Sequence, residues 1–371
     1  MIKFVMPKVC KRCWSRNGFS KVDSEFIENE QECKLCNGCF LNLNKIADKI
    51  IKELESIPGI QTFSIGTSIP KESEAIEEKI WDFTDFRKWK SIKPELNTEL
   101  GKIIEKKTKY KFSPDPDVRI IYDIKNDRIS KQISSIYLYG KYNKLQRGIR
   151  QTKKEGAKEE SVEELIERIL IKEIGTERSK AILHGSGRED IDVLMLGEGR
   201  PFVIEVTNPK KRILNEKEIE RINNIINKMN KGKIKVKFEK IVNKEWIEII
   251  KRAKFDKEYE AIVNLEKPID KNEISKLPKS ILLMQRTPKR VLIRRSDLIR
   301  KRRIKMLKPE WIDSHTIKLH ILSESGTYIK EFISGDDGRT QPSISSLLKT
   351  NATCKQLNVI SIHSEWLDDF W

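Results

Sequence analysis

The sequence predicts an α+β protein with a metal-binding segment at its N-terminus, and three observations support this prediction. The chain has 371 residues, enough for two or three domains of about 150 residues each. Helical and alternating apolar patterns are interspersed along it, so helices and strands share each domain. Four of its six cysteines fall in two Cys-x-x-Cys pairs near the N-terminus. We divide the chain into a metal-binding segment (1–44), an α+β accessory domain (45–155) and a larger α+β domain (156–371).

The cysteine pairs predict a structural zinc site. Cys10 and Cys13 are followed, nineteen residues later, by Cys33 and Cys36. Each pair presents two thiolates on one turn, and two pairs complete the tetrahedron that Zn²⁺ prefers. Since the protein supplies all four ligands, we expect the metal to stabilise the segment and not to catalyse. Cys39 could replace Cys36 as a ligand, and an iron–sulfur cluster or a redox pair is the alternative to zinc.

The accessory domain opens with an amphipathic helix. Apolar residues from Leu43 to Leu54 recur every three or four positions, and Pro58-Gly59 ends the pattern. The other elements expected here are a strand at 61–65, helices at 71–81 and 94–107, and two strands at 118–122 and 129–139 that form a hairpin. The basic segment 140–148 closes the domain, and a charged linker follows at 153–160.

The larger domain begins with a capping-box sequence. Ser161 and Glu164 have the spacing of that motif, and apolar residues from Val162 to Leu170 line one face of the helix that follows. The elements expected after it are a glycine-rich turn at 185–190, a strand at 202–206, a helix at 215–231, and strands at 233–238, 258–265, 280–284, 291–294, 317–322 and 357–362. Together they predict a mostly antiparallel sheet.

The charge of the chain points to a polyanionic partner. Lys and Arg number 74 and Asp and Glu number 56, which gives a net charge of +18. Nucleic acid is the expected partner of such a surface, although the Lys- and Glu-rich surface of a heat-adapted protein gives the same excess. No stretch approaches the ~18 apolar residues of a membrane helix, and the N-terminus is too short and too charged for a secretory signal. We expect a cytoplasmic protein without membrane contact.

The most informative segment is an acidic turn, His184-Gly-Ser-Gly-Arg-Glu-Asp190-Ile-Asp-Val193. Gly185 and Gly187 allow a tight turn and a close approach of a ligand to the backbone. Arg188 beside Asp190 favours an ionised carboxylate and could also bind phosphate. The segment lacks the Gly-Lys-Ser/Thr end of a phosphate-binding Walker loop. Taken alone, it fits either a functional carboxylate or a structural ion pair in a turn.

The acidic turn is the first of five ordered motifs, and its core Gly187-Arg-Glu-Asp-Ile-Asp-Val193 is continued by Leu196-Gly-Glu-Gly-Arg-Pro-Phe202. The other four motifs are Lys257-Glu-Tyr259, Gln285-Arg-Thr-Pro288, Gly326-Thr-Tyr328-Ile-Lys330 and Ser345-Ser-Leu347-Leu. With these motifs the chain resembles the tenth family of tRNA pseudouridine synthases, which occurs in archaea and eukaryotes, and the first motif resembles the catalytic motif of that family. The resemblance implies a THUMP-like RNA-binding domain in 45–155 and a pseudouridine synthase domain in 156–371.

The resemblance also implies roles for single residues. Asp190 takes the position of the catalytic carboxylate, which either attacks the ribose or removes a ribose proton to form a glycal. Lys330 takes the position of its basic partner, where many related enzymes have Arg. Tyr259 and Tyr328 take the positions of two tyrosines that line the pocket of a flipped uracil.

Further contacts with RNA are expected around this centre. Leu347 would pack against the sugar or base, and Arg188 would hold a phosphate or fill the stack that the uridine leaves. Glu189 and Asp192 are the rival carboxylates. Additional RNA-binding residues are expected at the domain junction and in a basic run, namely Tyr142, Lys144, Arg147, Arg150, Arg294 and Arg295.

The reaction implied is the isomerisation of uridine to pseudouridine in the TΨC arm of tRNA, at uridines 54 and 55. It needs no organic cofactor, and no obligate protein partner is evident. The alternative is a zinc- and THUMP-bearing RNA-binding or tRNA-assembly protein without catalysis. A tRNA methyltransferase or thiolase is disfavoured, because the sequence has neither a glycine-rich cofactor turn after a strand nor a Ser-Gly-Gly-x-Asp-Ser loop.

Overall fold

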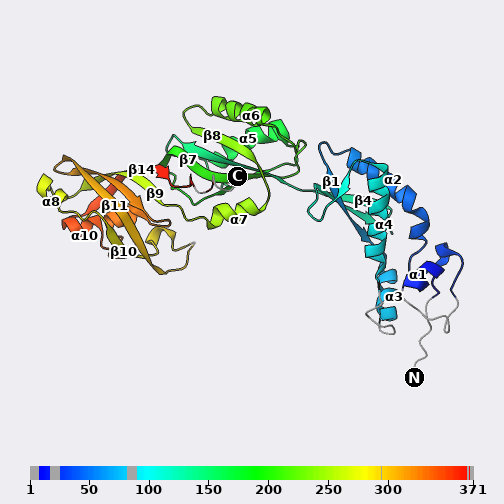
Figure 1. The fold of residues 1–371 in the computed structure, drawn as a ribbon. Helices are drawn as coiled ribbons and strands as arrows, with labels where there is room; N and C mark the ends of the chain where they lie inside the picture. Colours follow the sequence, from blue (N-terminus) through cyan, green and yellow to red (C-terminus); the bar gives the residue numbers. More distant parts are fainter. Residues whose placement is uncertain (1–7, 17–25, 82–89, 294, 366, 368–371) are drawn as a thin grey trace, which may run out of the picture. The chain divides into compact units, whose positions relative to one another are not determined.

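The computed structural model describes residues 8–16, 26–81, 90–293, 295–365 and 367. The chain forms two compact units (Figure 1). The first comprises Met1–Ser135 and Thr207–Ile213, and the second comprises Ile136–Val206 and Leu214–Trp371. Within the described ranges, no helix combines the length and the apolar character that crossing a membrane requires.

The first unit is an α+β fold whose helices share one core with a four-stranded sheet. Its helices are α1 (Lys11–Arg16), α2 (Leu43–Glu55), α3 (Lys71–Trp81) and α4 (Ile92–Lys107), with 3₁₀ turns at Glu30–Glu32 and Cys39–Asn42. Its strands are β1 (Thr62–Ser68), β2 (Lys111–Phe112), β3 (Val118–Asp123) and β4 (Arg128–Ile133). The sheet order is β2-β1-β3-β4, with β1 parallel to β2 and β3 and with β4 antiparallel to β3. The apolar face of α2 is buried as predicted, and α4 packs against α2 and β1.

A segment between β7 and α6 of the second unit returns to the first unit and is anchored there by Arg212. The Arg212 guanidinium is buried, pairs with Asp117 at 3.1 Å and donates to the carbonyl of Ser134. The same carboxylate accepts the backbone N–H groups of Gln61 (2.8 Å) and Thr62 (2.9 Å). Burial opposes ionisation of Asp117, but these N–H groups and Arg212 lower its pKa. The segment therefore helps to fix the start of β1.

The second unit is built on one large, mostly antiparallel sheet, as predicted. The order is β13-β10-β11-β12-β9-β14-β7-β5-β8, with β6 paired to β7. The strands are β5 (Ile136–Lys144), β6 (Ala181–Gly185), β7 (Val193–Val206), β8 (Ile234–Val242), β9 (Lys257–Leu265), β10 (Ile281–Arg286), β11 (Ile299–Asp313), β12 (Thr316–Ser323), β13 (Thr340–Gln341) and β14 (Ala352–Ile362). The helices are α5 (Val162–Ile174), α6 (Glu216–Met229), α7 (Glu245–Arg252), α8 (Lys271–Ser275), α9 (Ile329–Ser334) and α10 (Ile344–Leu348). Because β14 runs parallel to β7, with Leu357 opposite Val193, the C-terminal strand lies beside the residues that follow the acidic turn.

The capping box predicted at the start of α5 is confirmed. The Ser161 hydroxyl accepts the N–H of Glu164 at 3.1 Å, and the Glu164 carboxylate accepts the N–H of Ser161 at 2.9 Å. The first N–H groups of a helix have no partner within the helix, and this reciprocal pair provides partners for two N–H groups at the start of α5.

The strand predictions differ from the structure at several places. The single strand expected at 129–139 is two strands, β4 and β5, which belong to different sheets. The strand expected at 291–294 is replaced by a 3₁₀ turn, Lys289–Val291, and Arg294 lies outside the described residues. The sequence analysis missed β11, because basic residues crowd this strand and only Ile304 and Leu307 are buried.

The boundaries between the units also differ from those expected. Since β5 pairs with β7 and β8, the second unit begins at Ile136 and not at residue 156. The cysteines near the N-terminus share one hydrophobic core with α2 and α4, so 1–44 and the accessory domain form a single unit.

Candidate active site and metal centre

The acidic turn connects the antiparallel strands β6 and β7 of the second unit. Gly185 at the end of β6 lies opposite Phe202 of β7. Gly187 has a φ of +80°, and an added Cβ would lie 3.1 Å from Nη1 of Arg200. Both the backbone conformation and the close guanidinium therefore favour glycine at this position.

A buried ion pair lies beneath the turn. Nε of Arg200 is 2.8 Å from Oε2 of Glu189, and the two side chains are 2% and 1% exposed. The Tyr142 hydroxyl lies 2.9 Å and 3.0 Å from the two carboxylate oxygens, and Arg200 donates to the carbonyl of Ser186 at 2.7 Å. Gln151 donates to the Tyr142 hydroxyl at 2.8 Å. Glu189 is thus fully engaged inside the protein.

Lys144 fixes the backbone of the turn from the inside. Its buried Nζ donates to the carbonyls of Ile149 (2.9 Å), Asp190 (2.9 Å) and Ile191 (3.3 Å). Burial lowers the pKa of Lys144, although the nearby Glu189 opposes this shift. The ammonium therefore holds the main chain of Asp190 while the Asp190 side chain remains outside.

The structure contradicts an RNA-binding role for Tyr142 and Lys144. Both side chains are completely buried, and their polar atoms bind Glu189, Gln151 and backbone carbonyls. A strand that alternates Lys and Tyr resembles a nucleic-acid-binding surface in sequence. In β5, however, these residues point into the core and support the turn.

The Asp190 carboxylate lies at the surface between two cations. Its side chain is 37% exposed. Oδ1 accepts a hydrogen bond from Nη1 of Arg290 at 2.9 Å, and Oδ2 lies 3.3 Å from Nζ of Lys330. The predicted pair of Asp190 and Lys330 is therefore brought together, and Arg290 joins it.

Lys330 is shared between two carboxylates. Its Nζ lies 2.8 Å and 2.7 Å from the two oxygens of Asp192, closer than it lies to Asp190. Burial opposes the charge of Lys330, but the two carboxylates raise its pKa. Lys330 in turn lowers the pKa of Asp192 against the effect of burial. Asp192 is thus the main partner of Lys330.

The two predicted tyrosines lie on separate elements. Tyr259 is in β9, and burial raises its pKa to about 12 despite the charge of Arg200 nearby. Tyr328 precedes α9, and its backbone N–H and carbonyl both bind the side chain of Gln285. Its hydroxyl lies 3.2 Å from Nη1 of Arg295. Tyr328 is therefore held by its backbone, while its hydroxyl meets an exposed cation.

The remaining predicted contacts are spread over the second unit. Leu347 in α10 is half-buried against the core, and Arg188 is exposed beside Asp190. Arg147 donates to the carbonyls of Asp192 and Leu357 and to the side chain of Asn358. Arg150 pairs with Glu159 at 3.0 Å. Arg147 thus supports the acidic turn from its C-terminal side.

Sequence reasoning missed two residues that are close to Asp190. Arg290 was visible only as one of many basic residues between β10 and β11. Glu331 follows Lys330 and binds Arg290, with 2.6 Å between Nε and Oε1. The adjacent charged residues Lys330 and Glu331 at the start of α9 were the signal in the sequence for these ion pairs.

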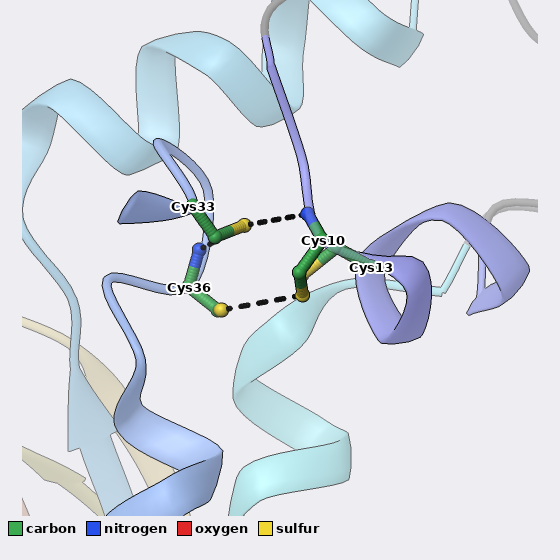
Figure 2. Close-up of side chains that lie close together, drawn as sticks. All are labelled: Cys10, Cys13, Cys33 and Cys36. Carbon is green, nitrogen blue, oxygen red and sulfur yellow. Dashed lines mark hydrogen bonds between the residues drawn. The ribbon is translucent and has the colours of Figure 1, made fainter. Parts of the chain in front are cut away.

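The four predicted cysteines form one buried cluster in the first unit (Figure 2). The ligand atoms of Cys10, Cys13, Cys33 and Cys36 all lie within 4.8 Å of one another. The Cys10 and Cys36 sulfurs are 3.8 Å apart, and Zn–S bonds of about 2.3 Å place tetrahedral sulfurs about 3.8 Å apart. Cys39 is buried but is not among the four. The donor set therefore fits a tetrahedral zinc ion.

Two arginines of α1 connect this cluster to α4. Arg16 is 3% exposed, and its Nη1 lies 3.6 Å from Sγ of Cys13. Arg16 and Arg12 both pair with Glu95 of α4, and the Arg12 guanidinium lies 3.9 Å from the centre of the Phe40 ring. A cation beside the cluster would partly offset the negative charge of four thiolates around Zn²⁺.

Comparison with known proteins gives matches over most of the chain. The model of the Pus10 C-terminal domain matches residues 137–363, and the model of the archaeal Pus10 THUMP domain matches residues 46–123. The tRNA pseudouridine synthase Pus10 of Pyrococcus furiosus is 41% identical, over 93% of this chain and 86% of its own length. That of Methanosphaera stadtmanae is 35% identical, over 96% of both chains. A solved Cbf5-Nop10-Gar1 complex is 15% identical over 60% of this chain and 48% of that chain, and its TM-score of 0.32 supports no argument.

The fold and these matches define a THUMP domain joined to a pseudouridine synthase domain, as the resemblance predicted. The chain belongs to the Pus10 family. The match of residues 137–363 begins within β5, in agreement with the start of the second unit.

Proposed function

We propose that this chain converts uridine to pseudouridine in tRNA, with Asp190 as the catalytic carboxylate. Its curated Pus10 relatives are named tRNA pseudouridine synthase, so membership of the family makes it an isomerase. We choose Asp190 as the catalytic carboxylate because of its exposure and its neighbours. Asp190 is partly exposed between Arg290 and Lys330, whereas Glu189 is buried against Arg200.

The proposed reaction rearranges bonds within one nucleotide. Asp190 either attacks C1′ of the ribose or removes a ribose proton to form a glycal. The bond between N1 and C1′ breaks, the uracil turns, and a bond forms between C5 and C1′. C5 then loses its proton and N1 gains one, so the product has the same atoms as the substrate. This chemistry consumes no organic cofactor.

Tyr259 and Tyr328 are proposed to hold the flipped uracil. An aromatic face can replace part of the stacking that the base loses when it leaves the RNA. Because burial raises the pKa of Tyr259 to about 12, its hydroxyl is protonated at neutral pH and can donate a hydrogen bond. Leu347 is proposed to pack against the sugar or base.

The finer substrate and metal assignments are also proposals. Family resemblance favours uridines 54 and 55 of the TΨC arm, and the exposed cations Arg188 and Arg295 would bind RNA phosphates there. We assign Zn²⁺ to the four-cysteine cluster, where it would cross-link the N-terminal segment. We further propose that the protein acts in the cytoplasm.

The test is incubation of the protein with an unmodified tRNA transcript in buffer without any cofactor. Nuclease digestion and mass spectrometry after cyanoethylation, which labels pseudouridine, should locate the product at 54, 55 or both. Product elsewhere in the tRNA would contradict the TΨC assignment. Binding of tRNA without any product, from a folded protein with its metal bound, would instead favour the non-catalytic RNA-binding role.

A further inference from the structure

We propose that Arg290, oriented by Glu331, positions the Asp190 carboxylate for reaction. The inference rests on the proposed function, because it concerns the carboxylate placed at the centre of that reaction. It assigns a positioning role to two residues that the five sequence motifs did not single out.

The guanidinium of Arg290 joins two carboxylates with three of its nitrogens. Nε lies 2.6 Å from Oε1 of Glu331, Nη2 lies 3.3 Å from Oε2 of Glu331, and Nη1 lies 2.9 Å from Oδ1 of Asp190. A guanidinium is planar, so a two-point contact with Glu331 fixes both its plane and the direction of Nη1. The orientation of Arg290 therefore determines where Oδ1 of Asp190 is held.

Glu331 is a suitable anchor for this contact. It lies in the first turn of α9, and its side chain is only 6% exposed. The residues on both sides of it, Lys330 and Phe332, are held by Asp192 and by the core. The helix therefore gives Arg290 a buried, fixed partner that belongs to the protein itself.

Lys330 alone does not provide this orientation. Its ammonium is a point charge on a flexible stem, and it lies closer to Asp192 than to Asp190. Arg290 and Lys330 meet different oxygens of Asp190, Oδ1 at 2.9 Å and Oδ2 at 3.3 Å. The contact with Arg290 is the shorter of the two, so Arg290 is the cation that holds Oδ1 of Asp190 most closely.

The competing role for Arg290 is a phosphate contact in the basic region. Three of its nitrogens already bind acids, and these carboxylates raise its pKa although burial opposes the shift. Lys289 is the matched control, because it is the adjacent cation, is exposed, and pairs with Asp337 instead of Asp190.

The experiment compares Arg290→Gln, Glu331→Gln, the double variant and Lys289→Gln in full-length protein. Single-turnover rates are measured at saturating enzyme, with the Kd for tRNA and the melting temperature measured in parallel. We expect both single variants to lose at least tenfold in rate, with Kd within twofold of the wild type. The double variant should be no slower than Arg290→Gln, because Glu331 acts through Arg290. Lys289→Gln should retain the wild-type rate.

Several outcomes would overturn the proposal. A wild-type rate with a raised Kd in Arg290→Gln would show a phosphate contact. An equal further loss on adding Glu331→Gln to Arg290→Gln would show that the two residues act independently. If Arg290→Gln does not fold, Arg290→Lys replaces it, and a wild-type rate in that variant would contradict a role for the planar fork. Asp190→Asn separates the two hypotheses: an active Asp190→Asn refutes the proposed catalytic residue, whereas an inactive one beside a fully active Arg290→Gln refutes only this inference.

Discussion

Replacing Glu189 by Gln should strongly destabilise the second unit. The change removes one charge and keeps the side-chain shape, so the buried Arg200 guanidinium loses its ionic partner at 2.8 Å. With the two side chains only 1% and 2% exposed, water cannot replace that partner. Breaking a buried pair in this way costs about 3–5 kcal/mol of unfolding free energy. Arg200 would keep its hydrogen bond to the carbonyl of Ser186, but this acceptor is uncharged and offsets little of the loss.

The assay must report on the second unit alone. Urea titration with hydrogen-exchange mass spectrometry of peptides from β6 and β7 provides the unfolding free energy of that region. Arg200→Gln and the double variant complete a thermodynamic cycle, in which the double variant should be less destabilised than the sum of the two single variants. A loss below 1 kcal/mol in Glu189→Gln, or strict additivity, would refute the buried-pair explanation.

Three further predictions concern the base, the metal and a buried lysine. Tyr259→Phe keeps the ring, so it should lose less single-turnover rate than Tyr259→Ala; equal losses would contradict a stacking role. Elemental analysis of the purified protein should find about one zinc per chain. Cys10→Ser with Cys33→Ser should release the metal and lower the melting temperature of the first unit, and unchanged stability without metal would contradict a structural role. Burial lowers the pKa of Lys257 from 10.5 to about 8. Between these pH values the unfolded chain binds a proton at Lys257 that the folded chain has released, so this residue adds stability as the pH rises, and the stability of the wild type should increase relative to that of Lys257→Met. Parallel slopes in urea titrations of the two proteins between pH 8 and 10 would refute this prediction.

Elements with a strong apolar period could be predicted from sequence. The helices α2 and α5 occur where the pattern placed them, and the start of α5 follows from the hydrogen-bonding capacity of Ser161 and Glu164. By contrast, basic residues interrupt the apolar residues of β11, only Ile304 and Leu307 are buried, and the strand lies between β10 and β12 in the sheet. A strand that shows no regular alternation of apolar and polar residues has no periodic signal by which to recognise it.

The division of the chain into units required tertiary information. The apolar residues from Ile129 to Tyr139 read as one strand, because local sequence does not state which sheet a residue joins. In the structure β4 pairs with β3, and β5 pairs with β7 and β8. The return of the segment anchored by Arg212 to the first unit depends on its contacts with Asp117 and Ser134, which are distant in sequence.

The residues of the candidate site that lie in short contiguous motifs could be predicted from the sequence. The contacts made by residues outside such motifs could not. The cysteine spacing indicated a cluster that the structure assembles, and the acidic turn does bring Asp190 near Lys330. The direction in which Tyr142 and Lys144 point depends on the faces of β5, which a basic and aromatic composition does not reveal. Arg290 reaches Asp190 from a turn after β10, so no local motif links the two residues.

The most direct test of the account compares Asp190→Asn with Asp192→Asn on the same unmodified tRNA transcript. Both changes remove one carboxylate charge near Lys330, but only the first removes the carboxylate that Arg290 holds. We predict no detectable pseudouridine from Asp190→Asn, with tRNA binding retained, and measurable product from Asp192→Asn. Pseudouridine formed at the wild-type rate by Asp190→Asn would contradict the central claim.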